Sequence, residues 1–157
     1  TGVCQGATVS KATPYDAAAT TGHKVLLLAT HDDALIEQTS VLPADWQVTF
    51  DPASDAYAAV DLVACAVRTS ETFVKDCDGY EEDDKPTGNV AKLHNASYRL
   101  TVHAATTGKE LGGTDVVAED DTCPMFVLFD AGETTKDYYV PLPEEPVVEF
   151  LKPFVQP

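Results

Sequence analysis

The sequence predicts a mainly β fold: an antiparallel, sandwich-like domain of about six to eight short strands with one or two short helices. Short apolar segments recur along the chain, several alternate apolar with polar residues, and turn-forming residues separate them. The length of 157 residues suits a single domain, which we expect over 1–157 with an irregular lead-in at 1–22. An α+β arrangement is the alternative, because a helix is expected near the end of the chain.

The first third of the chain is predicted to combine two strands with a short helix. Residues 23–29 (HKVLLLA) form an apolar run that is typical of a buried strand. Thr30 and Asp33 match the capping-box positions of a helix start, so we expect a short helix or turn at 34–37. Residues 46–50 (WQVTF) alternate apolar and polar residues and predict a strand.

The clearest strand covers residues 97–106, where apolar residues alternate strictly with polar ones. This alternation places His103 on the outward face. A turn at Thr107-Gly108 would return the chain as a partner strand at 109–118, with a bulge at Gly112-Gly113.

Three further elements are predicted near the end of the chain. Residues 125–129 and 138–140 are short apolar runs that indicate strands. Residues 144–154 carry Pro146 in the first turn and an apolar stripe, which is typical of a helix packed against a core.

Four cysteines without a C-x-x-C pair predict two disulfides and therefore an exported protein. The alternative is four free thiols in a cytosolic protein. Of the three connectivities, we favour the bond between Cys65 and Cys77, which lie in two neighbouring strand-like runs that a hairpin would bring together. This choice leaves Cys4 to pair with Cys123.

Charge excludes several kinds of partner. The chain has 10 Lys and Arg against 26 Asp and Glu, a net charge of −16. Nucleic acids and anionic membranes need clustered cations, so they are poor partners. No apolar run approaches the ~20 residues of a membrane span, so we expect no membrane insertion. The acidity fits either a solvated extracellular surface or adaptation to high salt.

An acidic stretch at 76–84 raises the hypothesis of a calcium-stabilised module, since Ca²⁺ prefers carboxylate oxygens. The EF-hand pattern fails: with Gly79 at its glycine position, Val74 and Lys85 occupy the two key acidic positions. A solvated charged loop is the simpler interpretation, and no other cofactor is expected. The candidate ligands are Asp76, Asp78, Glu81 and Asp83.

Catalytic motifs are scarce. The G-x-S-x-G elbow, the P-loop and the G-x-G-x-x-G loop are absent from the sequence. His31 beside Asp32 and Asp33 is the most enzyme-like group, because a carboxylate can orient an imidazole that acts as a general base. This group supports a secreted hydrolase as the second hypothesis, although acidic residues are also ordinary in a first helical turn.

The leading hypothesis is therefore a non-catalytic secreted or cell-surface domain that binds or supports a protein or a glycan. Exposed aromatic rings would carry this binding, and the candidates are Tyr138, Tyr139 and Trp46. Asn95-Ala96-Ser97 is an N-glycosylation sequon placed just before the predicted strand.

Five short segments between residues 60 and 124 resemble an exported domain of actinobacterial proteins of unknown function. The resemblance implies export and disulfide bonding and brings no catalytic or ligand-binding residue. The segments are Leu62–Cys65, Cys77–Tyr80, Tyr98–Val102, Ala105–Lys109 and Cys123-Pro124.

Overall fold

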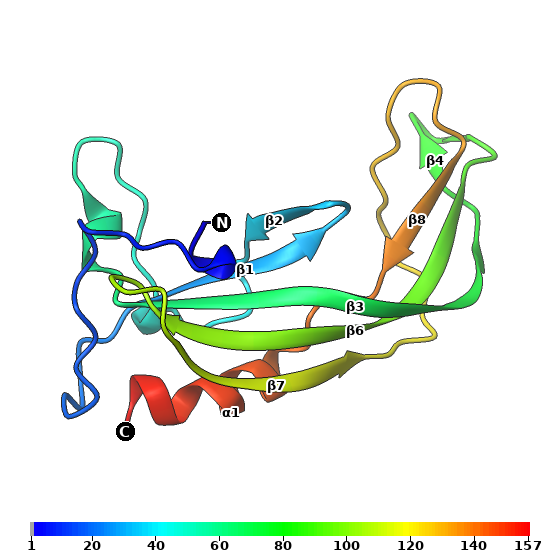
Figure 1. Cartoon of the computed structure of the whole chain (residues 1–157). Helices are drawn as coiled ribbons and strands as arrows, with labels where there is room; N and C mark the ends of the chain where they lie inside the picture. The colour runs from blue at the N-terminus through cyan, green and yellow to red at the C-terminus, as the bar shows by residue number, and fades with distance from the viewer. Residues whose placement is uncertain (1) are drawn as a thin grey trace.

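A computed structural model describes residues 2–157, and its centre is a six-stranded mixed sheet (Figure 1). The sheet order is β2-β1-β3-β6-β7, and β8 also pairs with β6. The mainly β class with short helical elements is confirmed. The strands are β1 (Val25–His31), β2 (Ala34–Glu37), β3 (Leu62–Cys77), β4 (Glu81–Glu82), β5 (Lys85–Pro86), β6 (Val90–Ala104), β7 (Glu110–Ala118) and β8 (Thr135–Tyr139). The helical elements are η1 (Gly2–Gln5), η2 (Ala44–Trp46), η3 (Ala56–Ala59) and α1 (Glu144–Val155).

The sheet is mixed rather than wholly antiparallel. β1 runs parallel to β3, and β8 runs parallel to β6. The other pairs, β1 with β2, β3 with β6 and β6 with β7, are antiparallel. The second layer consists of α1 and irregular segments, while β4 and β5 form a separate two-stranded hairpin.

Two apolar clusters hold the two faces of the sheet. On one face α1 packs through Val147 and Leu151, both 0% exposed, as the predicted amphipathic helix requires. On the other face η1 contributes Val3, which packs with Leu28 and Val63. In Figure 1 the N-terminal segment lies above the sheet and α1 below it.

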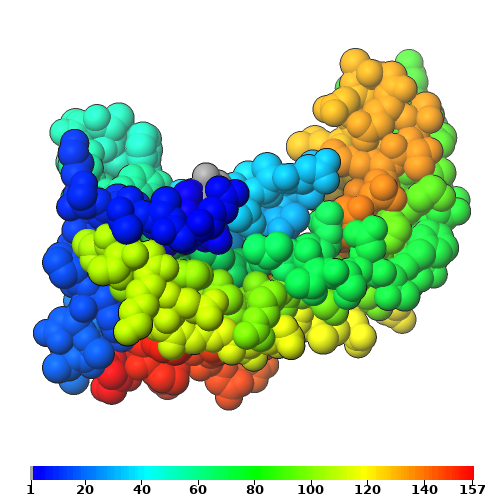
Figure 2. Space-filling model, in the orientation of Figure 1, coloured from blue at the N-terminus to red at the C-terminus, as the bar shows by residue number. Residues whose placement is uncertain are grey.

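The strands β3 and β6 extend well beyond the body of the sheet and carry a projection at one end (Figure 1). The projection consists of the β4–β5 hairpin, residues 124–134 and β8, and we call it the distal arm. Figure 2 shows the distal arm standing out from the rest of the molecule. Because β3 and β6 pair over almost their whole length, the base of this arm is part of the main sheet.

The predicted disulfide pairing is wrong: the bonds are Cys4–Cys65 and Cys77–Cys123. β3 runs from Leu62 to Cys77 without the expected hairpin. At about 3.3 Å per residue, Cys65 and Cys77 are therefore about 40 Å apart along one strand. The first bond joins η1 to the middle of the sheet, and the second fixes the base of the distal arm.

Three local predictions are wrong. Asp32 has a φ of 51°, and it turns β1 into β2 where a helix start was expected. Trp46 ends a 3-10 helix with its ring buried, so the predicted strand at 46–50 is absent. His103 is buried rather than outward, because its ring contacts the Gly108 carbonyl and the Thr101 hydroxyl.

The β6–β7 hairpin and the C-terminal helix are confirmed. β7 returns beside β6 as predicted, and Leu111 is the extra residue of a bulge next to Gly112. α1 begins at Glu144 and carries Pro146 in its first turn. Within residues 2–157, no helix is both long and apolar enough to cross a membrane.

Candidate functional site

A cleft of about 370 Å³ opens between the β1–β2 turn and β8. His31 and Asp32 line one side, and Tyr138 and Tyr139 line the other. The structure thus brings together two groups of residues that the sequence singled out separately. Arg68 of β3 also lines the cleft.

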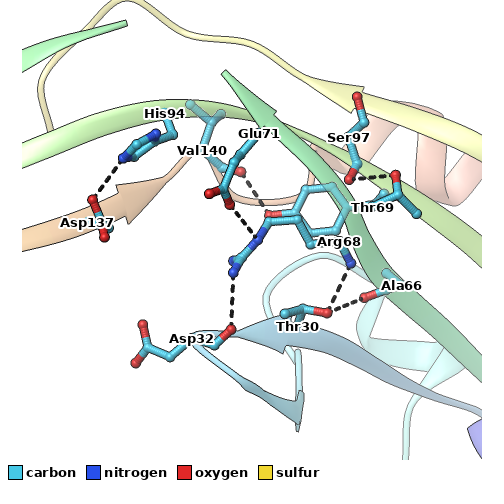
Figure 3. Close-up of polar contacts among 11 residues, drawn as sticks. Thr30, Asp32, Ala66, Arg68, Thr69, Glu71, His94, Ser97, Asp137 and Val140 are labelled. Carbon is cyan, nitrogen blue, oxygen red and sulfur yellow. Dashed lines mark hydrogen bonds and ion pairs between the residues drawn. The ribbon is translucent and has the colours of Figure 1, made fainter. Parts of the chain in front are cut away.

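Arg68 connects three segments in the cleft, and Figure 3 shows its contacts with Asp32 and Glu71. Its guanidinium carbon lies 3.6 Å from the centre of the Tyr139 ring, a cation–π contact. Nη2 donates a hydrogen bond of 3.2 Å to the Asp32 carbonyl, and Nε lies 3.4 Å from Glu71. The side chain is only 13% exposed, so these contacts with the protein occupy most of its surface.

Two side chains pack against the Tyr139 ring. Arg68 lies over the ring, and the His94 ring stacks with it at 5.1 Å with an interplanar angle of 30°. His94 is held in turn by Asp137, whose carboxylate lies 2.9 Å from Nε2 (Figure 3). Burial raises the pKa of the Tyr139 hydroxyl, and the charges of Glu71 and Asp137 add to this effect. The ring is therefore engaged by protein side chains, which disfavours it as a platform for a sugar.

The other two predicted binding aromatics are also engaged in packing. Trp46 is 4% exposed and belongs to the core beneath α1, so its prediction as a surface anchor is wrong. Tyr138 is half-buried and packs against the same core.

The proposed catalytic group is not preorganised. His31 Nε2 lies 3.8 Å from the Asp32 carboxylate, beyond hydrogen-bond distance. The two side chains are 65% and 61% exposed, and Asp33 is exposed at the same turn. All four cysteines are in disulfides, so no thiol nucleophile is present.

The predicted calcium ligands are spread over the base and hairpin of the distal arm. Asp76 forms an ion pair of 3.1 Å with Lys92, while Asp83 lies at the turn between β4 and β5. Asp78 and Glu81 are exposed. In the part of the chain that the structure describes, no three Asp, Glu, His or Cys side chains are grouped to hold a metal ion.

The sequon lies inside a strand rather than before one. Asn95 belongs to β6, is half-buried, and accepts a hydrogen bond of 3.0 Å from the Asp120 amide. Glycosylation at Nδ2 would attach a sugar to a half-buried residue inside a paired strand, so the site is a poor acceptor in the folded protein.

The distal arm exposes three large apolar side chains that the sequence analysis placed in a strand. Met125, Phe126 and Leu128 are 84%, 86% and 87% exposed. We call these three residues the apolar tip. Val127 and Phe129 are half-buried and pack against the core, so the segment shows one side to the molecule and the other to solvent.

The loop that carries the apolar tip is held by contacts on both sides. The Tyr80 hydroxyl donates a hydrogen bond of 3.0 Å to the Pro124 carbonyl, and its ring lies 5.8 Å from Phe129. Lys136 Nζ donates a bond of 2.9 Å to the Leu128 carbonyl. The Cys77–Cys123 bond fixes the start of the segment. The exposed side chains thus stand on an anchored loop.

A groove of about 1120 Å³ separates this loop from the β4–β5 hairpin. The apolar tip lines one side. The rim carries five carboxylates and one cation, Lys85. The carboxylates belong to Glu81, Glu82, Asp83, Asp130 and Glu133.

Sequence reasoning missed the apolar tip because residues 125–129 were interpreted as a strand. The run is apolar at every position, a pattern that is equally consistent with a buried strand, so the sequence carries no local signal of this exposure. Comparisons with protein-family models, with curated proteins and with solved structures found no match. The resemblance to an exported actinobacterial domain therefore stays a prediction.

Proposed function

We propose that this protein is a non-catalytic, extracytoplasmic binding module that recognises a partner protein through the apolar tip of its distal arm. The observation that carries the proposal is the 84–87% exposure of Met125, Phe126 and Leu128. Clustered apolar exposure is uncommon on soluble proteins and is typical of interaction sites. Phe and Met are also enriched at the cores of protein interfaces.

The anchoring of the loop supports this function. Tyr80, Lys136 and the Cys77–Cys123 bond hold the segment while its apolar side chains face water. Exposing these apolar side chains to water is unfavourable, because burying apolar surface lowers the free energy. A preorganised loop loses little conformational freedom when a partner covers it, which favours binding. The two disulfides support an extracytoplasmic location, since such bonds persist in oxidising compartments.

A protein partner is favoured over a glycan. Sugar sites usually present a free aromatic face, whereas the Tyr139 ring is engaged by protein side chains and Trp46 is buried. The apolar tip combines one Phe with two flexible aliphatic side chains, a composition that suits an apolar protein surface.

Selection from a random peptide library displayed on phage tests the proposal. Peptides are selected on the wild-type protein and then assayed against the apolar-tip variant (M125S/F126S/L128S). We expect most selected peptides to lose at least tenfold in affinity for the variant, as interface anchors do on truncation. The matched control removes three exposed apolar side chains elsewhere (V9S/F50S/V117S) and should retain affinity. Peptides that bind both variants as well as wild type would reject the proposal.

The cleft at Arg68 supports a second candidate, a site for a small polar ligand or hydrolysis involving His31. Its volume of about 370 Å³ is within the range of ligand pockets. A ligand-detected NMR screen of small polar compounds tests it: binding that disappears in the His31→Ala variant supports the candidate. Binding that is unaffected, or none at all, rejects it.

A further inference from the structure

From the charge around the apolar tip, we infer that the partner presents a cationic segment with interspersed apolar side chains. This inference rests on the proposed function and specifies the chemistry of the partner. The apolar side chains would cover Met125, Phe126 and Leu128, and Lys or Arg side chains would face the carboxylates of the groove.

The charge distribution carries the inference. The groove rim holds five carboxylates and a single lysine. Glu81 and Glu82 belong to the exposed hairpin on one side, and Asp130 and Glu133 follow the apolar tip on the other. Apolar and acidic groups thus line the same groove. Interfaces arrange opposite charges to face one another, so a cationic segment is the complementary occupant.

Other occupants fit the groove less well. An anionic membrane or an acidic protein would be repelled by the rim carboxylates and by the net charge of −16. A second copy of this chain would place the acidic rims of two arms against each other, because the same patch meets itself in a two-fold dimer.

Three synthetic peptides of equal length test the inference by fluorescence anisotropy. One contains Leu and Lys, one contains Leu and Glu, and one contains Ser and Lys. We expect the Leu/Lys peptide to bind wild type and the other two to bind at least tenfold more weakly. The apolar-tip variant should bind the Leu/Lys peptide at least tenfold more weakly than wild type, whereas V9S/F50S/V117S should keep the wild-type affinity.

A matched pair of charge variants separates the groove from the general acidity of the protein. E81Q/E82Q/D83N removes three rim carboxylates, and E144Q/E145Q/E149Q removes three from α1. We expect the rim variant to weaken Leu/Lys binding at least fivefold more than the α1 variant does. Equal effects of the two variants would overturn the inference.

The outcomes distinguish this inference from the proposed function. If Leu/Glu binds as well as Leu/Lys and both need the apolar tip, the cationic partner is wrong and the protein-binding function stands. If no peptide depends on the apolar tip, the proposed function fails as well. Binding to phosphatidylcholine vesicles that depends on the apolar tip would assign the groove to a membrane. A dimer that sedimentation detects in wild type and not in the apolar-tip variant would assign the groove to a second copy. Either result would overturn the inference.

Discussion

His23 and Asp61 form a buried pair that fixes the irregular N-terminal segment to the sheet. Nδ1 lies 2.5 Å from the Asp61 carboxylate, and Nε2 lies 2.8 Å from the Ala19 carbonyl. The Ala19 carbonyl and an ionised Asp61 carboxylate both accept hydrogen bonds, so the protonated imidazolium satisfies both contacts at once. Burial lowers the pKa of His23, but the hydrogen bonds to Asp61 and Ala19 outweigh it, and the net shift is upward.

The raised pKa predicts a dependence of stability on pH. The pair contributes its full stability below about pH 6.5, the ordinary histidine pKa, and loses it as pH rises through the raised value in the folded protein. Thermal unfolding between pH 5.5 and 9 should show a fall in Tm that is smaller in the His23→Gln variant. The exposed His31→Gln variant is the control and should behave as wild type. An unchanged pH profile in His23→Gln would refute this role.

Arg68 and Tyr139 are expected to be energetically coupled. A desolvated cation–π contact contributes about 1–2 kcal/mol, and Arg68 is largely buried against the Tyr139 ring. A double-mutant cycle with Arg68→Met and Tyr139→Leu, measured by urea unfolding, should give a coupling free energy of about 1 kcal/mol or more. Strictly additive effects would mean that the contact contributes nothing.

The continuous strand β3 explains the disulfide pattern. The sequence was interpreted as two strand-like runs joined by a hairpin, yet residues 68–71 between them contain no Gly, Pro or Asn to form its turn. β3 continues through it with irregularities near Thr69 and Val74. The weakness of this turn signal was readable from the sequence, since Ser70 is the only residue of the stretch that favours turns. The pairing of Cys65 with Cys4 and of Cys77 with Cys123 was not readable from the sequence, because it depends on the packing of distant segments.

The two disulfides should differ in function more than in stability. Their sequence separations of 61 and 46 residues imply similar contributions, about 4 kcal/mol each from chain entropy. Both C4S/C65S and C77S/C123S should therefore lower Tm. Only C77S/C123S should speed amide exchange in the distal arm and weaken binding of the selected peptides. Equal binding losses at a temperature where both variants are folded would contradict the anchoring role of Cys77–Cys123.

Gly112 allows α1 to approach β7 closely. A Cβ atom at this position would lie 2.8 Å from the Phe154 ring, closer than real contacts permit. We expect Gly112→Val to lower the free energy of unfolding by about 1–3 kcal/mol through overpacking. Adding Phe154→Leu should recover part of the loss, and Val117→Ala on the same strand is the control. A neutral Gly112→Val variant would show that α1 shifts freely.

Some elements follow from local sequence and others do not. The β6–β7 hairpin and α1 were predictable, since alternation, a Thr-Gly turn and a helical apolar stripe lie within each segment. The apolar tip was not, because its exposure depends on Tyr80 and Cys77, which are distant in sequence. His31 and Tyr139 were each singled out, but their shared cleft arises from the parallel pairing of β8 with β6.

At the scale of the whole molecule, the net charge of −16 predicts a general response to salt. Added NaCl should raise Tm, because screening reduces repulsion among carboxylates. CaCl₂ at equal ionic strength should raise Tm no further, since Asp76, Asp78, Glu81 and Asp83 form no metal-binding group. An additional calcium gain that EDTA reverses would restore the calcium hypothesis.

The apolar tip belongs to the distal arm, which stands out from the packed body (Figure 2) and is fixed at its base by Cys77–Cys123. This placement leaves the tip accessible and predicts that stability and binding are separable. Side chains that are 84–87% exposed contribute little to folding, so the apolar-tip variant should keep its Tm within about 2 °C of wild type.

The most direct test of the protein-binding function is isothermal titration of the selected peptides into wild type and the apolar-tip variant. We predict a loss of at least tenfold in affinity with an unchanged fold, as for anchors at the centre of an interface. Equal affinity for the two proteins would contradict the assignment of Met125, Phe126 and Leu128 as the binding surface.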